Sequence, residues 1–209
     1  MSEFSNDFQA DLLRLMRRRR DVRRFRTDPV DETLLRECLA TFSLAPSVGL
    51  SEPWRIVRVQ SEAARAAALA NFEAANAAAL DGYEGEKSCL YSSLKLSGMR
   101  EAPVHLAVFC DETTPKGAGL GAQTMPEARR YSVAGAIAHV WLAARARGLG
   151  LGWVSILDPE RLAQDLDIPQ DWRLVAYLCL GWPETESDTP ELELAGWERR
   201  LQDVPVETR

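Results

Sequence analysis

The sequence has 209 residues, 46% of them hydrophobic and 27% charged, with a formal net charge of −6 and a pI of about 5.1. These values are typical of a single globular domain. They disfavour a disordered chain and a dedicated nucleic-acid binder, which is more often basic. The longest apolar stretch, residues 133–144, is too short to span a bilayer, and no secretory signal is evident. We therefore expect a cytoplasmic protein that binds neither nucleic acid nor membrane.

Cysteine and histidine do not indicate a metal centre. The four cysteines are scattered, mostly among apolar residues, and form no CxxC motif, so we expect reduced thiols in the core. The two histidines have no spacing typical of metal ligands, so we expect no metal. These residues are Cys38, Cys89, Cys110 and Cys179, with His105 and His139.

Helices and strands are predicted in mixed order along the chain. Apolar spacing and helix propensity predict helices over residues 6–19, 31–42, 61–80, 88–101, 128–147 and 158–166. Buried strands are predicted over residues 54–59, 104–111, 153–157 and 174–181. The helix predicted over residues 128–147 is apolar around most of its circumference, which predicts burial in a core or at a dimer interface. The mixture predicts one domain, residues 1–209, of the α+β or α/β class.

Six arginines stand within eight residues, in the stretch RRRRDVRR from Arg17 to Arg24. Guanidinium groups this close repel one another unless an anion or solvent separates them, and their forked donors fit phosphate. From the cluster alone, a solvated helix end is the more common explanation, because cations are favoured at a helix C-terminus. A nucleic-acid patch is disfavoured by the acidic remainder of the chain.

Three other segments are candidate parts of a site. The glycines of GLGLGWVS (148–155) follow a helix and precede a strand, which is the reverse of a dinucleotide-binding fingerprint, so we reject a Rossmann site. They predict a helix stop, where a backbone without side chains also lets a flat group approach. The small-residue loop APSVG (45–49) lies between a helix and a strand, where ligand sites are common. Arg199 and Arg200, in GWERRL, are interpreted either as exposed surface charges or as residues that contact an anion.

Taken in this order, the segments resemble the nitroreductase-like flavoproteins, from about residue 14 to residue 201. RRDVRRF corresponds to the phosphate motif of that family, and SVAGAIAHVWLAARARGLGLGW to its long interface helix and glycine-rich strand entry. Further segments resemble the 5,6-dimethylbenzimidazole synthases within the family. They are Asp21 inside RRDVR, APSVG followed by PW, YSSLKLSGMREAP, RYSVAGAI and GLGLGWVSIL.

The resemblance implies a three-layer α/β/α fold of the α+β class, in which helices flank a mixed sheet, and a homodimer of the domain-swapped type. FMN would lie at the subunit interface under a lid of about residues 61–97. Carried over position by position, the implied FMN contacts are Arg19, Arg20, Asp21, Val22, Arg23, Ser43, Ser47, Gly49, Ser92, Leu151, Gly152 and Arg199.

Asp21 is the most informative of these residues. An ionised carboxylate cannot donate a hydrogen bond, and two anions about 4 Å apart repel by roughly 1 to 4 kcal/mol. Asp21 should therefore face the ribityl chain while the arginines hold the phosphate, and there it can act as a general base. Without the resemblance, an ion pair with Arg17 or Arg24 is the better interpretation. By the same resemblance, Ser155 would orient or relay a proton near the reacting edge of the flavin.

The implied reaction is an oxygen-dependent fragmentation of reduced FMN to 5,6-dimethylbenzimidazole, the lower ligand of cobalamin, and a four-carbon sugar phosphate. No metal is needed, because the flavin supplies the chemistry. A separate NAD(P)H:flavin reductase would supply the reduced FMN. One alternative is an FMN-dependent NAD(P)H nitroreductase or quinone reductase, against which Asp21 and the long lid argue. A second is an FMN-binding storage or sensor protein.

Overall fold

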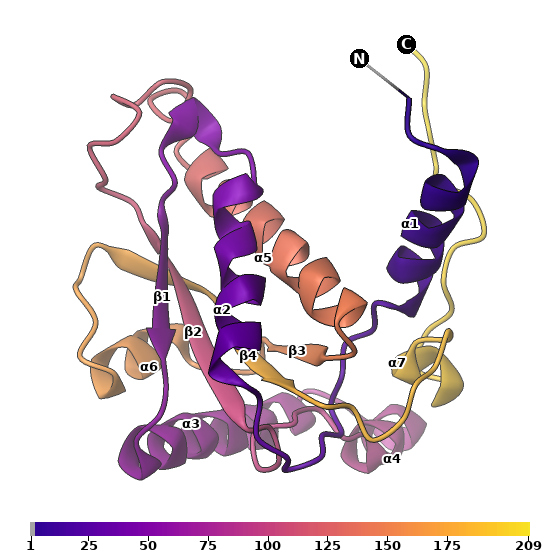
Figure 1. The fold of residues 1–209 in the computed structure, drawn as a ribbon. Coiled ribbons are helices and arrows are strands. Elements are labelled where there is room, and N and C mark those ends of the chain that lie inside the picture. Colours follow the sequence, from indigo (N-terminus) through magenta and orange to yellow (C-terminus); the bar gives the residue numbers. More distant parts are fainter. Residues whose placement is uncertain (1–2) are drawn as a thin grey trace.

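A four-stranded sheet lies between two layers of helices in the computed structural model, which describes residues 3–209 (Figure 1). Each neighbouring pair of strands is antiparallel. A parallel bridge from Asp21 to Leu151 adds the N-terminal segment to the edge of β3, so the sheet is mixed at that edge. The strands are β1 (Trp54–Arg58), β2 (Val104–Asp111), β3 (Gly150–Val154) and β4 (Trp172–Gly181), in the order β1-β2-β4-β3.

Helices cover both faces of the sheet, which confirms the predicted three-layer α+β fold. α2 (Glu32–Ala40) and α5 (Ala128–Ala146) pack on one face, and α3 (Glu62–Leu80) and α6 (Pro159–Asp165) pack on the other (Figure 1). No helix within residues 3–209 is long and apolar enough to cross a membrane. The other helical elements are α1 (Asn6–Arg18), α4 (Gly85–Ser93), α7 (Glu191–Leu194) and the 3-10 turns η1 (Thr41–Leu44) and η2 (Val48–Leu50).

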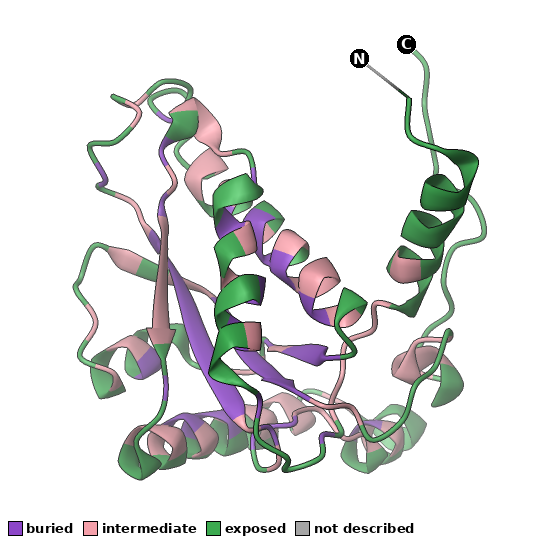
Figure 2. Cartoon of the chain, in the orientation of Figure 1, coloured by how far each residue is buried: buried purple, intermediate pink, exposed green. Residues whose placement is uncertain are grey.

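Successive residues of the central strands supply the two halves of the core, because side chains alternate between the faces of a strand. Leu106 and Leu178 belong to the apolar cluster under α2 and α5, whereas Ala107 and Tyr177 belong to the cluster under α3 and α6. β2 and β4 are buried along most of their length, as the purple strands of Figure 2 show. Burial on both faces explains why their sequences are continuous apolar runs.

Two predicted elements are displaced in the structure. The helix predicted over residues 88–101 is wrong in its extent, because α4 ends at Ser93 and Leu96 and Met99 then turn into the core beside Phe25. The strand predicted over residues 153–157 spans Gly150–Val154 instead, so glycines expected to precede the strand are part of it. Tertiary contacts, rather than local propensity, decide both boundaries.

The first half of the lid expected over residues 61–97 is packed against the sheet. Ala68 and Phe72 of α3 are buried against the sheet, and the side chain of Asn71 exchanges hydrogen bonds of 2.9 and 2.8 Å with the main chain of Asp158. A helix bound in this way cannot lift without opening the core. The candidate lid is therefore residues 81–97, which contain α4.

The arginine-rich segment runs between β3 and the chain that follows β4. The N–H of Val22 donates to the carbonyl of Leu151 at 3.1 Å, and the N–H of Arg26 donates to the carbonyl of Trp182 at 2.8 Å. Phe25 is 1% exposed and anchors the segment in the core. Residues 21–26 are thus held on both sides by main-chain hydrogen bonds.

Gly150 and Gly152 make room for this segment. A Cβ on Gly152 would lie 2.1 Å from the carbonyl oxygen of Val22, and a Cβ on Gly150 would lie 2.8 Å from the Val22 side chain. Within the chain, Val22 fills the space where Cβ atoms of these residues would lie, and the approach of a flat group to this backbone stays a prediction. Gly148, with a φ of 82°, ends α5 as predicted.

Gly152→Ala should destabilise the protein more than Gly150→Ala. The methyl group at residue 152 meets a main-chain carbonyl that is fixed by pairing with β3, which should cost about 3 kcal/mol or more, whereas the Val22 side chain can shift for about 1 kcal/mol. Denaturant unfolding of the natural protein and the two variants measures the difference. Equal losses of unfolding free energy would show that Val22 does not constrain Gly152 as described.

A polar pair is buried in the core under α3. His105 of β2 is 1% exposed, and its Nδ1 lies 2.8 Å from the hydroxyl oxygen of Tyr177 of β4. Burial, helped by the positive charge of Arg65, lowers the pKa of His105 to about 4. Burial also raises the pKa of Tyr177, so both groups are neutral near neutral pH.

The protein should lose stability as the pH falls from about 6.5 towards 4. In this window the unfolded chain binds a proton at His105 that the folded chain excludes, so the unfolding free energy should fall by about 2.5 kcal/mol at pH 4.5 from this group. Denaturant unfolding across the window should show a steeper loss for the natural protein than for His105→Gln. If the unfolding free energies of the two proteins fell equally with pH, the buried imidazole would not be neutral as described.

Candidate functional site

The chain leaves α1 at Arg18 and turns along the edge of β3, which brings the arginines of the predicted phosphate motif together. The guanidinium of Arg19 lies over the ring of Trp141 on α5, 4.6 Å from its centroid. The indole nitrogen of Trp141 donates to the carbonyl of Arg20 at 3.2 Å. An open cavity of about 250 Å³ adjoins this turn. The residues that line it are Arg19, Arg20, Asp21, Arg23, Pro190, Glu191, Leu192 and Arg200.

Arg20 carries a positive charge that its surroundings compensate poorly. Its Nε is buried and has no hydrogen-bond partner among residues 3–209, although a terminal nitrogen donates to the carbonyl of Arg17. Burial, followed by the positive charges of Arg200 and Arg19, lowers the pKa of Arg20, but a guanidinium stays protonated in proteins. A buried donor among three cations is a site that an anion would stabilise, and phosphate matches the guanidinium fork.

Asp21 is held at both carboxylate oxygens. Its Oδ1 accepts the N–H of Trp153 at 2.8 Å, and its Oδ2 accepts the Nε of Arg23 at 3.0 Å. The partner is therefore neither Arg17 nor Arg24, the two arginines considered from the sequence. About a third of the Asp21 side chain is exposed, and it lines the arginine cavity. Each oxygen keeps a lone pair that no described residue occupies.

Arg23 connects Asp21 to the segment that follows α4. Its side chain is 13% exposed, and while its Nε holds Asp21, its Nη1 donates to the carbonyl of Lys95 at 3.4 Å. The side chain of Lys95 in turn pairs with Glu101. Two of the three guanidinium nitrogens of Arg23, which is expected to contact FMN, thus bind within the chain and position Asp21, while Arg23 also lines the arginine cavity.

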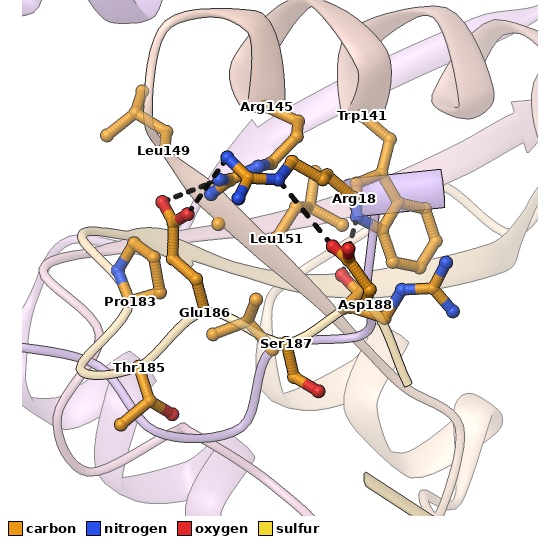
Figure 3. A pocket seen from close by; sticks show the side chains of 13 residues that line it. Arg18, Trp141, Arg145, Leu149, Leu151, Pro183, Thr185, Glu186, Ser187 and Asp188 are labelled. Carbon is orange, nitrogen blue, oxygen red and sulfur yellow. Dashed lines mark hydrogen bonds and ion pairs between the residues drawn. The ribbon is translucent and has the colours of Figure 1, made fainter. Parts of the chain in front are cut away.

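An acidic segment faces the outer arginines, and sequence reasoning missed it. Figure 3 shows Glu186 between Arg18 and Arg145, with nitrogen–oxygen distances of 3.4 and 2.6 Å, and Asp188 lies 3.5 Å from Arg18. The signal that could have found it is the acidic run ETESDTPELE, residues 184–193, which balances the basic run near the start of the chain. These ion pairs neutralise Arg18 and Arg145, which we call the outer arginines. Arg20 has no carboxylate within ion-pair distance among the described residues.

The expected contacts Ser43, Ser47 and Gly49 lie apart from the arginines. Ser132, near the start of α5, accepts a hydrogen bond from their loop, whereas Trp141, near the end of α5, contacts the arginine segment. The two contact points are nine residues apart on the helix, which corresponds to about 14 Å. One chain therefore does not bring the two groups together.

The side chains of this second group are engaged locally. Ser43 is exposed and donates to the carbonyl of Ala40 at 2.7 Å, and the Ser47 hydroxyl accepts the N–H of Glu52 at 3.0 Å. Gly49 has a φ of 56°, and a Cβ there would lie 2.7 Å from the carbonyl oxygen of Leu120. The glycine is therefore explained by the close approach of residues 117–121.

The other expected residues divide between the core and the surface. Val22 and Leu151 pair with one another, and Leu151 is buried, so both shape the floor of the site through their backbone. Ser155 follows β3 directly and is exposed. Ser92 is exposed and donates to a carbonyl of its own helix at 2.9 Å. Near the C-terminus it is Arg200, rather than Arg199, that lines the arginine cavity.

Three of the four thiols lie where the sequence predicts them. Cys38, Cys110 and Cys179 are buried free thiols, but Cys89 is exposed on α4, so the expectation of a core thiol is wrong there. Burial, together with the negative charge of Asp21, raises the pKa of Cys179, which keeps this thiol neutral beneath the site. Residues 3–209 contain no group of three or more His, Cys, Asp or Glu placed to hold a metal ion.

Inorganic phosphate should stabilise the protein through Arg20. The unfolding free energy should rise by about 1 kcal/mol when phosphate is present at roughly five times its dissociation constant, and Arg20→Gln should lose this gain. Arg145→Gln is the matched control, because Arg145 lines the adjoining cavity but already pairs with Glu186. Thermal unfolding in phosphate and in chloride of equal ionic strength tests this, and equal gains in both variants would rule out Arg20 as the anion site.

Comparison with known proteins gives the family. The sequence profile described as the nitroreductase family matches residues 16–182. The chain belongs to the nitroreductase family. Two similar curated proteins are 5,6-dimethylbenzimidazole synthases. That of Rhodospirillum rubrum is 54% identical and aligns over 94% of this chain and 93% of its own, and one of Rhodobacter capsulatus is 48% identical over 95% and 96%.

Other family members are more distant. An NADH dehydrogenase of Thermus thermophilus is 32% identical over 81% of this chain and 85% of its own. Among solved structures, iodotyrosine deiodinase, crystallised with FMN and 3-iodo-L-tyrosine, superposes with a TM-score of 0.74 at 22% identity, covering 95% of this chain and 100% of that one. A likeness at this identity concerns the fold.

Proposed function

We propose that the chain converts reduced FMN and O₂ to 5,6-dimethylbenzimidazole and a four-carbon sugar phosphate. The two synthases at 54% and 48% identity over nearly their full lengths support this activity over that of the more distant NADH dehydrogenase at 32%. The observation that carries the proposal is Asp21, fixed by the N–H of Trp153 beside a cluster of incompletely compensated arginines.

The residues present fit FMN. Its phosphate would meet Arg20, whose buried Nε has no partner among residues 3–209, with Arg19 and Arg200 on the same cavity. When bound, FMN supplies the electrons and the ring chemistry. Repulsion between carboxylate and phosphate keeps Asp21 away from the phosphate, so its free lone pairs would face the ribityl chain.

We assign Asp21 as the base that takes a proton from the ribityl carbon joined to the ring. Its two hydrogen-bond donors fix its orientation, so it needs no rearrangement before accepting a proton. Ser155 follows Trp153 by two residues and is exposed, so we assign its hydroxyl to orient or relay a proton at the flavin. The candidate lid, residues 81–97, would keep bulk water and nicotinamide from the flavin.

The proposed assembly is a homodimer in which each site draws on both chains. One chain leaves its serine loop and its arginines about 14 Å apart along α5, so a partner's loop is needed to complete the FMN contacts. Apolar side chains are exposed on α1, including Phe8 and Met16, and at the loop end, including Leu50 and Leu120. Exposed apolar patches of this kind are typical of protein interfaces.

Reduced flavin would come from a separate NAD(P)H:flavin reductase, and we place the protein in the cytoplasm. The four cysteines are free thiols, which suits a reducing compartment. The reductase can be replaced in the test tube by chemically reduced FMN, so the activity of this chain can be tested alone.

In air, the protein with pre-reduced FMN should form 5,6-dimethylbenzimidazole, detected by mass spectrometry. Asp21→Asn should still bind FMN but form product at least about 100-fold more slowly, because the base is lost while the arginines remain. Ser155→Ala should show a smaller loss. Asp28→Asn is the control, since Asp28 pairs with Arg26 and lies outside the arginine cavity.

Four outcomes would go against this assignment. Full yield from Asp21→Asn would remove Asp21 as the base, and an unchanged rate in Ser155→Ala would remove Ser155. Repeated NAD(P)H oxidation with a nitrofuran, without any benzimidazole, would instead identify a nitroreductase. FMN binding without product or turnover would favour a storage or sensor protein.

A further inference from the structure

An aromatic cluster joins the candidate lid to the C-terminal segment. The rings of Tyr83 and Tyr91 stack with their centroids 4.8 Å apart, and the ring of Trp197 meets both edge-on, at 5.5 and 6.1 Å. Tyr91 is 6% exposed although it belongs to the lid helix α4. We call these three residues the aromatic clamp. Such packing contributes beyond the area it buries, so the clamp favours one arrangement of the two segments.

Two polar contacts strengthen the clamp and tie it to the core. The ammonium of Lys87 on α4 lies 4.2 Å from the centroid of the Trp197 ring and donates to the Trp197 carbonyl at 3.0 Å. The hydroxyl of Tyr91 donates to Oδ1 of Asn76 on α3 at 2.8 Å. The chain at Trp197 is therefore attached to α3 by way of the lid.

The position of Trp197 relates the clamp to the anion site. Trp197 precedes Arg200 by three residues, which can span at most about 10 Å of extended chain. Arg200 lines the arginine cavity. Burial is the largest cause of the lowered pKa of Arg20, and the positive charge of Arg200 is the second largest. An anion between Arg20 and Arg200 would remove this repulsion and hold the C-terminal segment, and the clamp would pass that constraint to α4.

We propose that Trp197 is a positioning residue that couples closure of the lid to binding of the FMN phosphate. The inference rests on the proposed FMN site but concerns the order of α4, not the chemistry. Coupling of this kind is reciprocal, so the phosphate orders the lid and an ordered lid strengthens phosphate binding. Riboflavin, which has the same ring without the phosphate, would leave the lid uncoupled.

Hydrogen exchange of the α4 amides, residues 85–93, tests the coupling with oxidised FMN and with riboflavin, neither of which is consumed. In the natural protein, FMN should slow this exchange by about 5-fold or more, and riboflavin should slow it much less. Trp197→Leu should abolish the FMN-specific slowing and bring the affinity for FMN towards that for riboflavin. Trp197→Phe, which keeps an aromatic ring in the clamp, should restore both effects.

The outcomes separate this inference from the proposed function. FMN-specific slowing that persists in Trp197→Leu, or that is absent from the natural protein, would overturn the coupling. Slowing that depends on Trp197 in a protein that makes no benzimidazole would support the coupling while refuting the proposed reaction. Loss of exchange protection in Trp197→Leu even without ligand, at unchanged affinity for FMN, would reduce Trp197 to a structural contact and overturn its positioning role.

Discussion

Val22 donates its N–H to Leu151, and one residue earlier the carboxylate of Asp21 accepts the N–H of Trp153, so the arginine segment is attached to β3 at two adjacent points. This attachment favours a strand without side chains at Gly150 and Gly152, because the Val22 side chain lies beside Gly150 and the Val22 carbonyl oxygen lies where a Cβ of residue 152 would be. The arginines and the carboxylate of the motif are therefore set in fixed positions by the sheet, not by a flexible loop.

Charge is divided unevenly across this site. The acidic run 184–193 supplies partners for outer arginines such as Arg18 and Arg145, while Arg20 is left with a buried Nε that has no hydrogen-bond partner among the described residues. Asp21 lines the arginine cavity, and its two oxygens are already oriented by Trp153 and Arg23. The arrangement separates an anion-binding role from a proton-accepting role within a few residues, which the proposed fragmentation of FMN needs.

The sequence predicted the layers well and singled out the arginine segment, because both depend on local pattern. The apolar run of β2 and the periodicity of α5 specify buried elements wherever they occur, and the density of charge at Arg19–Arg23 marks the segment that forms the cavity. Asp21 could be singled out because a carboxylate is unexpected among phosphate-binding arginines.

What the sequence did not predict depends on contacts between distant residues. The role of Gly152 follows from the position of Val22, and the choice of Arg200 over Arg199 follows from how the C-terminal segment docks. An alanine-rich helix gives no sign of which face is buried, so the packing of Phe72 of α3 against the sheet could not be predicted. Nor does any local pattern bring Trp197 to α4.

The central claim is that the arginines bind the phosphate of FMN so that Asp21 faces the ribityl chain. A crystal structure of the protein with FMN tests it most directly. We predict the phosphate within hydrogen-bonding distance of Arg20 and Arg200, and the Asp21 carboxylate beside the ribityl carbon joined to the ring. A flavin anchored elsewhere, or Asp21 turned to solvent with the phosphate on other residues, would contradict the account.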